Sequence, residues 1–176
     1  AGFDVTTVDV SELALAEGYD WLLFLDSDVE LRRDTLHRLL GAGGDVVHAP
    51  YRPRWSAHVV VGVAGADGRV EILVNPQRLD AAGDAFPCAL VAAGCTLIRR
   101  PALDVPFTVA DYGFVRGEDI GFCVGLKARG VVPLCLARHH VEHLCQPWPR
   151  LLIPAGDDGP FRLDEEELVR RLRETS

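Results

Sequence analysis

The sequence contains no methionine, no CxxC pair and no apolar run long enough to cross a membrane. Its longest apolar runs, Trp21 to Leu25 and Ala89 to Ala93, fall far short of the roughly 20 residues that a membrane-spanning helix needs. The N-terminus also lacks the basic and then apolar layout of a signal peptide. We therefore expect a chain without a membrane span.

Basic charge and paired cysteines are scarce as well. Lysine and arginine together number 18 against 26 aspartates and glutamates, which gives a net charge of -8. Surfaces that follow nucleic-acid phosphates are basic, so we expect no nucleic-acid partner. The five cysteines are scattered, and several lie in apolar stretches, where a thiol behaves as a small hydrophobic group. We expect reduced thiols and a cytoplasmic protein, and the sequence does not indicate an oligomeric state.

The apolar pattern over residues 1–145 predicts alternating strands and helices, and hence a single α/β domain with a mostly parallel sheet flanked by helices. Residues 19–25 form a continuous apolar run, as expected of a strand buried on both faces at the centre of such a sheet. Residues 146–176 are expected to form an extended arm and a charged helix. Strands are expected at 3–10, 19–25, 45–49, 58–63, 70–74, 90–99 and 131–136, and helices at 11–17, 31–40, 118–129 and 165–173.

The first candidate for chemistry is the tripeptide Asp26-Ser27-Asp28, which follows the apolar strand. Ligands bind open α/β sheets beyond the carboxyl ends of their strands. Residues i and i+2 of an extended segment point to the same side, so both carboxylates can face one ligand. Carboxylates together with substrate phosphates are the usual ligands of Mg²⁺. The alternative is that Asp26 is a turn residue and Asp28 an N-cap of the next helix.

The second candidate is Gly117-Glu118-Asp119 at the start of a predicted helix. A carboxylate there can serve as a general base if it reaches a substrate hydroxyl. Acidic residues in a first turn also have an ordinary explanation, since they complement the positive end of the helix dipole.

The third candidate is the group of histidines His139, His140 and His143 near the C-terminus. A lone histidine is more often a packed or surface residue than a ligand, but one histidine with two carboxylates makes a sound divalent site. On a strand, alternation would place His139 and His143 on one side and His140 on the other. No cysteine has the ligand spacing of a zinc site.

Taken in order, these motifs resemble those of GT-A glycosyltransferases, most closely the family 2 group. The resemblance spans roughly residues 5–145 and includes the acidic motif, the strand 92–100 with Gly94, the Gly-Glu-Asp motif and the strand that ends in His143. It implies a Rossmann-like GT-A fold and transfer of a sugar from a nucleotide-diphosphate sugar to an acceptor hydroxyl, with Mn²⁺ or Mg²⁺ as the cofactor. The acceptor is not indicated.

The resemblance also implies a role for each matching residue. Asp28 and His143 would bind the metal, with His140 and His139 as replacements for His143. Asp26 would contact the nucleotide ribose, or the metal through water. Asp119 would be the general base of an inverting enzyme, with Glu118 in support. Gly94 would let the backbone approach the donor sugar.

The chain departs from this family before the acidic motif. A βαβ unit takes about 30 residues, and only residues 3–17 precede the motif, so we expect part of the N-terminal nucleotide-binding half to be lacking, on the order of 60 residues. Arg52, in the segment Tyr51 to Trp55, is a candidate for binding the donor diphosphate, and a plain surface loop is the alternative.

Two other functions remain open at this stage. A nucleotidyltransferase also uses paired carboxylates and a metal, but it predicts a glycine-rich triphosphate loop, and the sequence has none. A non-catalytic nucleotide- or carbohydrate-binding module predicts binding that survives Asp119→Asn without turnover.

Overall fold

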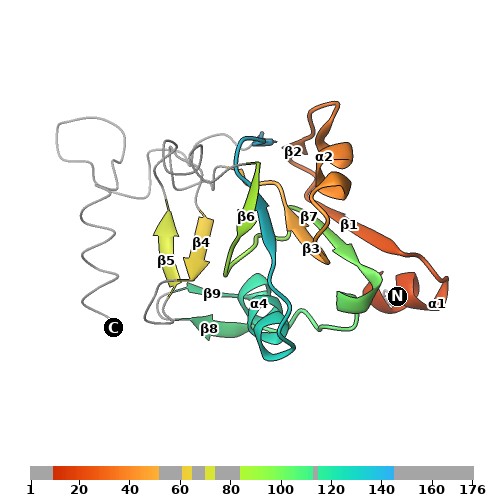
Figure 1. Cartoon of the computed structure of the whole chain (residues 1–176). Helices are drawn as coiled ribbons and strands as arrows, with labels where there is room; N and C mark the ends of the chain where they lie inside the picture. The colour runs from red at the N-terminus through yellow and green to blue at the C-terminus, as the bar shows by residue number, and fades with distance from the viewer. Residues whose placement is uncertain (1–9, 52–60, 65–69, 74–83, 113–114, 145–176) are drawn as a thin grey trace, which may run out of the picture.

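The computed structural model describes residues 10–51, 61–64, 70–73, 84–112 and 115–144. The predicted strand at 3–9, Arg52, and the predicted arm and helix of 146–176 lie outside these ranges. Figure 1 shows the sheet between helices α2 and α4, with α1 near the first strand. The elements are α1 (Val10–Ala16), β1 (Trp21–Leu25), β2 (Val29–Glu30), α2 (Thr35–Gly41), β3 (Val46–His48), β4 (Val61–Ala64), β5 (Val70–Leu73), β6 (Ala85–Pro87), β7 (Cys95–Arg99), the 3-10 helix η1 (Arg100–Ala102), β8 (Ala110–Tyr112), β9 (Val115–Gly117), α4 (Glu118–Ala128), β10 (Leu134–Leu136) and β11 (Glu142–His143).

The fold is mixed α/β, but its sheet is mostly antiparallel, so the prediction of a mostly parallel sheet was wrong. The five strands lie in the order β1-β7-β3-β10-β6, and only the β3–β10 pair is parallel. Strands β1, β3 and β10 run in one direction, and β7 and β6 run against them. Parallel strands need a long crossover, usually a helix. Helix α2 supplies such a crossover between β1 and β3. In the described part of the chain from β3 to β7, no helix supplies one.

Strand β1 was expected at the centre of the sheet, and this was also wrong. Among the described residues it is an edge strand that pairs only with β7, with Leu23 opposite Leu97. Its first four residues are half-buried and Leu25 is exposed. A continuous apolar run therefore does not require a central position here, because packing on both faces of an edge strand is enough to select apolar residues.

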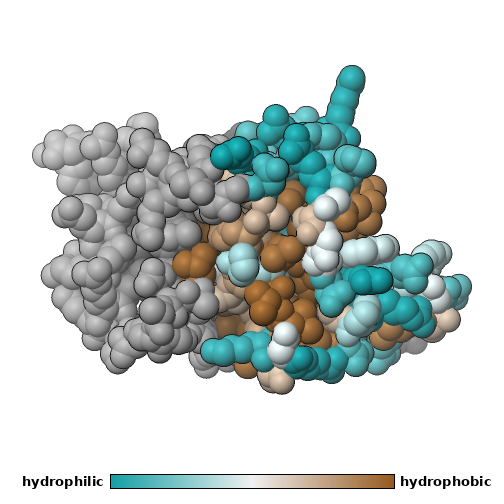
Figure 2. Space-filling view, in the orientation of Figure 1, coloured by the Kyte–Doolittle hydropathy of each residue, from teal (hydrophilic) through white to brown (hydrophobic). Residues whose placement is uncertain are grey.

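Alternate residues of the strands supply two hydrophobic cores, one on each face of the sheet. Val46 belongs to the core that Phe122 of α4 fills, and the next residue, Val47, belongs to the core that Leu39 of α2 fills. Both valines are fully buried. Figure 2 shows hydrophobic residues gathered in the middle of one face and bordered by hydrophilic ones. The sheet is thus held between α2 and α4, with one hydrophobic core on each of its faces.

Several local predictions are confirmed, and some are corrected. Helix α1 was expected at 11–17, although Val10 belongs to this helix and not to the preceding strand. The hairpin of β4 with β5 and the helix α4 were also expected. Helix α2 begins at Thr35, later than the predicted 31. The hairpin of β8 with β9 was not predicted, because residues 111–116 were interpreted as a loop before the helix.

Cys88, Cys95, Cys123 and Cys135 are free and buried, as expected of reduced thiols. Burial raises the pKa of each of these thiols, so they stay protonated and pack as apolar groups. In the part of the chain that the structure describes, no helix is long and apolar enough to cross a membrane.

Candidate functional site

The acidic tripeptide forms a tight turn at the carboxyl end of β1. The N–H of Val29 donates to the carbonyl of Asp26 over 3.1 Å, and the chain continues into β2. Helix α2 begins only at Thr35, and Asp34 occupies its N-cap position. The alternative interpretation of Asp28 as the N-cap of helix α2 is therefore excluded.

His143 lies against Asp28, although 115 positions separate them in sequence. His143 Nε2 is 3.2 Å from Asp28 Oδ2, and the two side chains are 9% and 30% exposed. Backbone pairing holds this contact, because β11 is antiparallel to β2 with His143 opposite Val29, and the N–H of Leu144 donates to the Asp28 carbonyl at 2.6 Å. The structure thus brings together the two residues that the sequence assigned to a metal.

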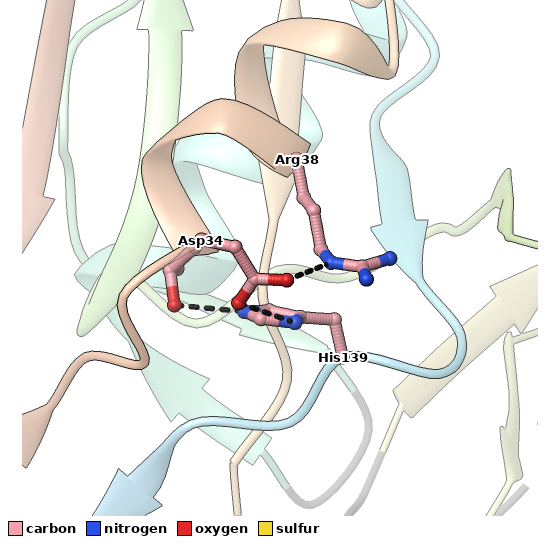
Figure 3. Close-up of polar contacts among 4 residues, drawn as sticks. Asp34, Arg38 and His139 are labelled. Carbon is pink, nitrogen blue, oxygen red and sulfur yellow. Dashed lines mark hydrogen bonds and ion pairs between the residues drawn. The ribbon is translucent and has the colours of Figure 1, made fainter.

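The other two histidines face elsewhere. His139 is buried, and its Nε2 is 2.7 Å from the buried Thr35 hydroxyl, while its Nδ1 is 3.9 Å from Asp34. Figure 3 shows Asp34 between His139 and Arg38, which donates to Asp34 over 2.5 Å. The pKa of His139 is lowered, mainly by burial. His140 Nε2 is 3.0 Å from the Ala137 carbonyl. The contacts of His139 attach the segment after β10 to the start of α2, whereas the contact of His140 lies within that segment.

Gly94 is packed against Asp26 and Tyr51. The N–H of Asp26 donates to the Gly94 carbonyl over 3.0 Å. A Cβ on residue 94 would lie 2.5 Å from Asp26 Oδ2 and closer still to the Tyr51 hydroxyl. A side chain at position 94 would therefore force Tyr51 or Asp26 to move, and the expected role of opening the backbone to a donor sugar stays a prediction.

Asp119 lies in the first turn of α4, and its side chain is half-buried. Gly121 allows this turn to approach the carbonyl of Thr108, because a Cβ at position 121 would overlap it. Burial raises the pKa of Asp119 to about 6, and the charges of Glu118 and Asp26 act in the same direction. A backbone hydrogen bond from Ala93 opposes this rise. Asp119 and Asp26 are thus close enough to influence each other, and both contact the backbone of residues 93–94.

Tyr51 was not assigned a role of its own by the sequence. Its ring packs edge-on against His143 at 5.1 Å between centroids and against His48 at 6.0 Å. Burial raises the pKa of its hydroxyl, with further contributions from the charges of Asp26 and Asp119, and a backbone hydrogen bond from Gly94 acts the other way. The sequence does indicate its location. Tyr51 follows the predicted strand 45–49 by two residues, and the carboxyl end of that strand lies on the same side of the sheet as that of the strand 19–25.

The residues present fit a hard divalent cation in part. Octahedral Mg²⁺ holds its ligands at about 2.1 Å, so two adjacent ligands lie about 3 Å apart, close to the Asp28 to His143 separation. A carboxylate oxygen and an imidazole nitrogen are both suitable donors for Mn²⁺. Among the described residues no group of three His, Cys, Asp or Glu side chains is arranged to hold a metal. The pair would therefore need water or phosphate oxygens to complete a coordination shell.

A pocket of about 210 Å³ lies next to α2, away from these residues. Neither Asp26 nor Asp28 lines it, and neither does Asp119 or His143, so it is not the site that the motifs indicate. Its lining residues come from α2, the start of β6 and the segment after β10, namely His37, Arg38, Gly41, Ala42, Asp84, Ala85, Leu136, Arg138 and His139.

No protein-family model matches the chain, and no curated protein matches it. Among solved structures, the chain is similar to the crystal structure of A197 from STIV, with 19% sequence identity and a TM-score of 0.47. The similarity covers 78% of this chain and 64% of that chain, so this chain spans less than two thirds of A197. The function must therefore be argued from the residues of the site.

Proposed function

We propose that the chain is a metal-dependent glycosyltransferase domain of the GT-A type, which moves a sugar from a nucleotide-diphosphate sugar to an acceptor hydroxyl. The observation that supports this best is the contact of Asp28 with His143, two distant residues that the resemblance pairs on a metal. Asp26 and Asp119, assigned to the donor and the base, both contact the backbone of residues 93–94. Four residues from three motifs are therefore linked by short contacts.

In this proposal Asp28 and His143 bind Mn²⁺ or Mg²⁺, and Asp26 binds the donor ribose or a metal-bound water. When bound, the metal stabilises the negative charge that develops on the leaving nucleoside diphosphate. Arg52 stays a candidate for the diphosphate and lies outside the described residues. The metal need not be held by the protein alone, because a diphosphate bridges to it.

Asp119 acts as the general base if the reaction inverts configuration. The acceptor oxygen forms a bond to the anomeric carbon as the bond from that carbon to the diphosphate oxygen breaks, and the acceptor proton moves to Asp119. The bonding electrons leave with the diphosphate. A pKa near 6 suits this role, because the carboxylate is mostly ionised at pH 7 and still basic enough to accept a proton. Glu118 supports it by raising that pKa.

A thermal-shift and hydrolysis screen of UDP-, GDP- and other nucleotide sugars, with and without Mn²⁺, tests the proposal. At least one donor should raise the unfolding midpoint only when Mn²⁺ is present, and Asp28→Ala should abolish that rise. Asp20→Ala, at an exposed carboxylate just before β1, is the matched control. A screen without any metal-dependent shift would refute the proposal, as would a shift that survives Asp28→Ala.

The same screen separates a transferase from a non-catalytic binding module. A transferase domain should hydrolyse its donor slowly in water, and Asp119→Asn should reduce turnover while leaving the thermal shift in place. Donor binding with no turnover in the parent chain would favour the binding module. A shift with nucleoside triphosphates alone would favour a nucleotidyltransferase.

A further inference from the structure

Tyr51 contacts each part of the proposed site. Its ring packs edge-on against His143 at 5.1 Å, on the metal side. Its hydroxyl shares the space beside Gly94 with Asp26 Oδ2, on the donor side, and a backbone hydrogen bond links it to Gly94. The charge of Asp119 also acts on this hydroxyl.

We propose that Tyr51 is a positioning residue that fixes two parts of the site independently, with its ring setting the orientation of His143 and its hydroxyl setting the position of Asp26 and Gly94. The inference rests on the proposed function, in which His143 binds a metal and Asp26 binds the donor. Tyr51 itself touches neither the metal nor the reacting atoms.

The ring restricts His143 because an imidazole can rotate about its bond to Cβ unless a neighbour blocks it. His143 Nε2 already points at Asp28, and the edge-on ring of Tyr51 lies beside that imidazole. Hydrogen-bonded partners that orient a metal-binding histidine typically contribute 10- to 100-fold to metal affinity, and a ring packed against the imidazole restricts the same rotation. Removing the ring should therefore weaken metal binding, even though tyrosine donates no ligand.

The hydroxyl has a separate task. A phenylalanine at position 51 would pack equally well in the hydrophobic core that includes Leu97 and Val141, so packing does not explain the oxygen. The space that this oxygen fills would be taken by a Cβ if residue 94 were not glycine. The residue pair Tyr51 and Gly94 therefore preserves a polar contact at the place where Asp26 faces the donor.

Two variants separate these tasks. Tyr51→Phe keeps the ring, so its Mn²⁺ affinity, measured from free Mn²⁺ by electron paramagnetic resonance, should stay within about twofold of the parent chain. Its affinity for UDP or GDP at saturating Mn²⁺ should fall about five- to tenfold, the effect of one lost hydrogen bond to a charged or polar group. Tyr51→Leu removes the ring but keeps apolar bulk, and its Mn²⁺ affinity should fall about tenfold or more.

Tyr19→Phe, at a tyrosine that is 61% exposed, is the matched control and should change neither affinity. Circular dichroism confirms that each variant is folded. Equal Mn²⁺ affinity in the parent chain and Tyr51→Leu would overturn the inference, as would Tyr51→Phe that binds nucleotide like the parent. A parent chain that binds no Mn²⁺ would instead refute the proposed function, and the inference with it.

Discussion

The Nε2 of His143 lies 3.2 Å from Oδ2 of Asp28, and the main chains beside these two residues are hydrogen-bonded to each other. Backbone pairing of β2 with β11 holds the two side chains at this separation, which distinguishes the contact from an exposed ion pair between two freely rotating side chains. A pair fixed in this way is already arranged for a shared ligand, because little side-chain freedom remains to be lost on binding.

Substitution of either member should weaken metal binding. We expect Asp28→Asn and His143→Gln each to lower Mn²⁺ affinity about tenfold or more, since each removes one of two protein donors. The measurement is a titration of free Mn²⁺ by electron paramagnetic resonance. His37→Gln, at an exposed histidine of α2, provides the control. Retention of full affinity in both site variants would show that the pair is structural.

Asp119→Asn should separate binding from turnover. Amides do not accept the acceptor proton, so kcat should fall about 100-fold or more while the donor-induced thermal shift remains. In the parent chain the base must be ionised, so activity should rise as pH increases through about 6, the pKa of Asp119. A rate that is flat from pH 5 to 8 would be inconsistent with Asp119 as the base.

Glu118→Gln offers a finer test of the same carboxylate. The negative charge of Glu118 raises the pKa of Asp119, so removing it should move the acidic limb of the pH–rate profile to lower pH. The plateau rate at high pH should change little if Glu118 acts only through this charge. A profile that keeps the same midpoint would show that Glu118 has no electrostatic effect on the base.

Gly94→Ala should damage both the site and the fold. The added methyl would overlap the Tyr51 hydroxyl and the Asp26 carboxylate, and such overpacking typically costs about 1–3 kcal/mol of unfolding free energy. Donor binding should weaken at the same time. Gly41→Ala is the control, because a Cβ there meets nothing within 4 Å and lies at the end of α2. Urea unfolding of both variants provides the comparison, and equal midpoints would contradict the prediction.

The buried His48 should make the fold sensitive to acid. Burial lowers the pKa of His48 from 6.5 to about 4, so protons bind the unfolded chain more readily. Its contribution is fully present above pH 6.5 and is lost as pH falls towards 4, by roughly 3 kcal/mol at 1.36 kcal/mol per pH unit. The pKa of Asp119 is raised, so its contribution to the free energy of unfolding increases as pH falls over part of this range, opposite to that of His48.

The contribution of His48 is therefore measured as a difference between two proteins. Urea unfolding of the parent chain and of His48→Gln, each between pH 7 and pH 4, cancels the effects of Asp119 and His139, which both proteins contain. The parent chain should lose more stability over this interval than the variant. Parallel curves for the two proteins would show that His48 does not titrate differently on folding.

The sequence predicts the local elements of this fold better than the directions of its strands. An apolar run such as 90–99 indicates a strand, but the pattern is the same whether the strand runs up or down the sheet. The reversed direction of β7 depends on the connection after β3, which has no described helix. The apolar run of β1 likewise indicates burial on both faces of the strand, but it does not indicate where β1 lies in the order of strands.

The candidate site could be predicted in part for a similar reason. Asp26, Asp28 and Asp119 lie at the ends of predictable elements, and their positions follow from those elements. The contact of His143 with Asp28 depends on the pairing of β11 with β2, and the expected strand ending in His143 did not specify that partner. The position of Tyr51 depends on tertiary packing against Gly94, and the sequence does not indicate which side chain fills the space beside a glycine. These relationships arise between segments, where one-dimensional patterns carry little information.

The antiparallel insertion of β7 between β1 and β3 gives residues 93–94 a special place. Because β7 begins at the edge where β1 ends, one short stretch of main chain bonds to Asp26 on one side and to Asp119 on the other. The separation between the donor and acceptor sides of the proposed reaction thus depends on residues 93–94. Lengthening that dipeptide by one residue is expected to separate Asp26 from Asp119, and with them the donor and acceptor sides of the proposed reaction.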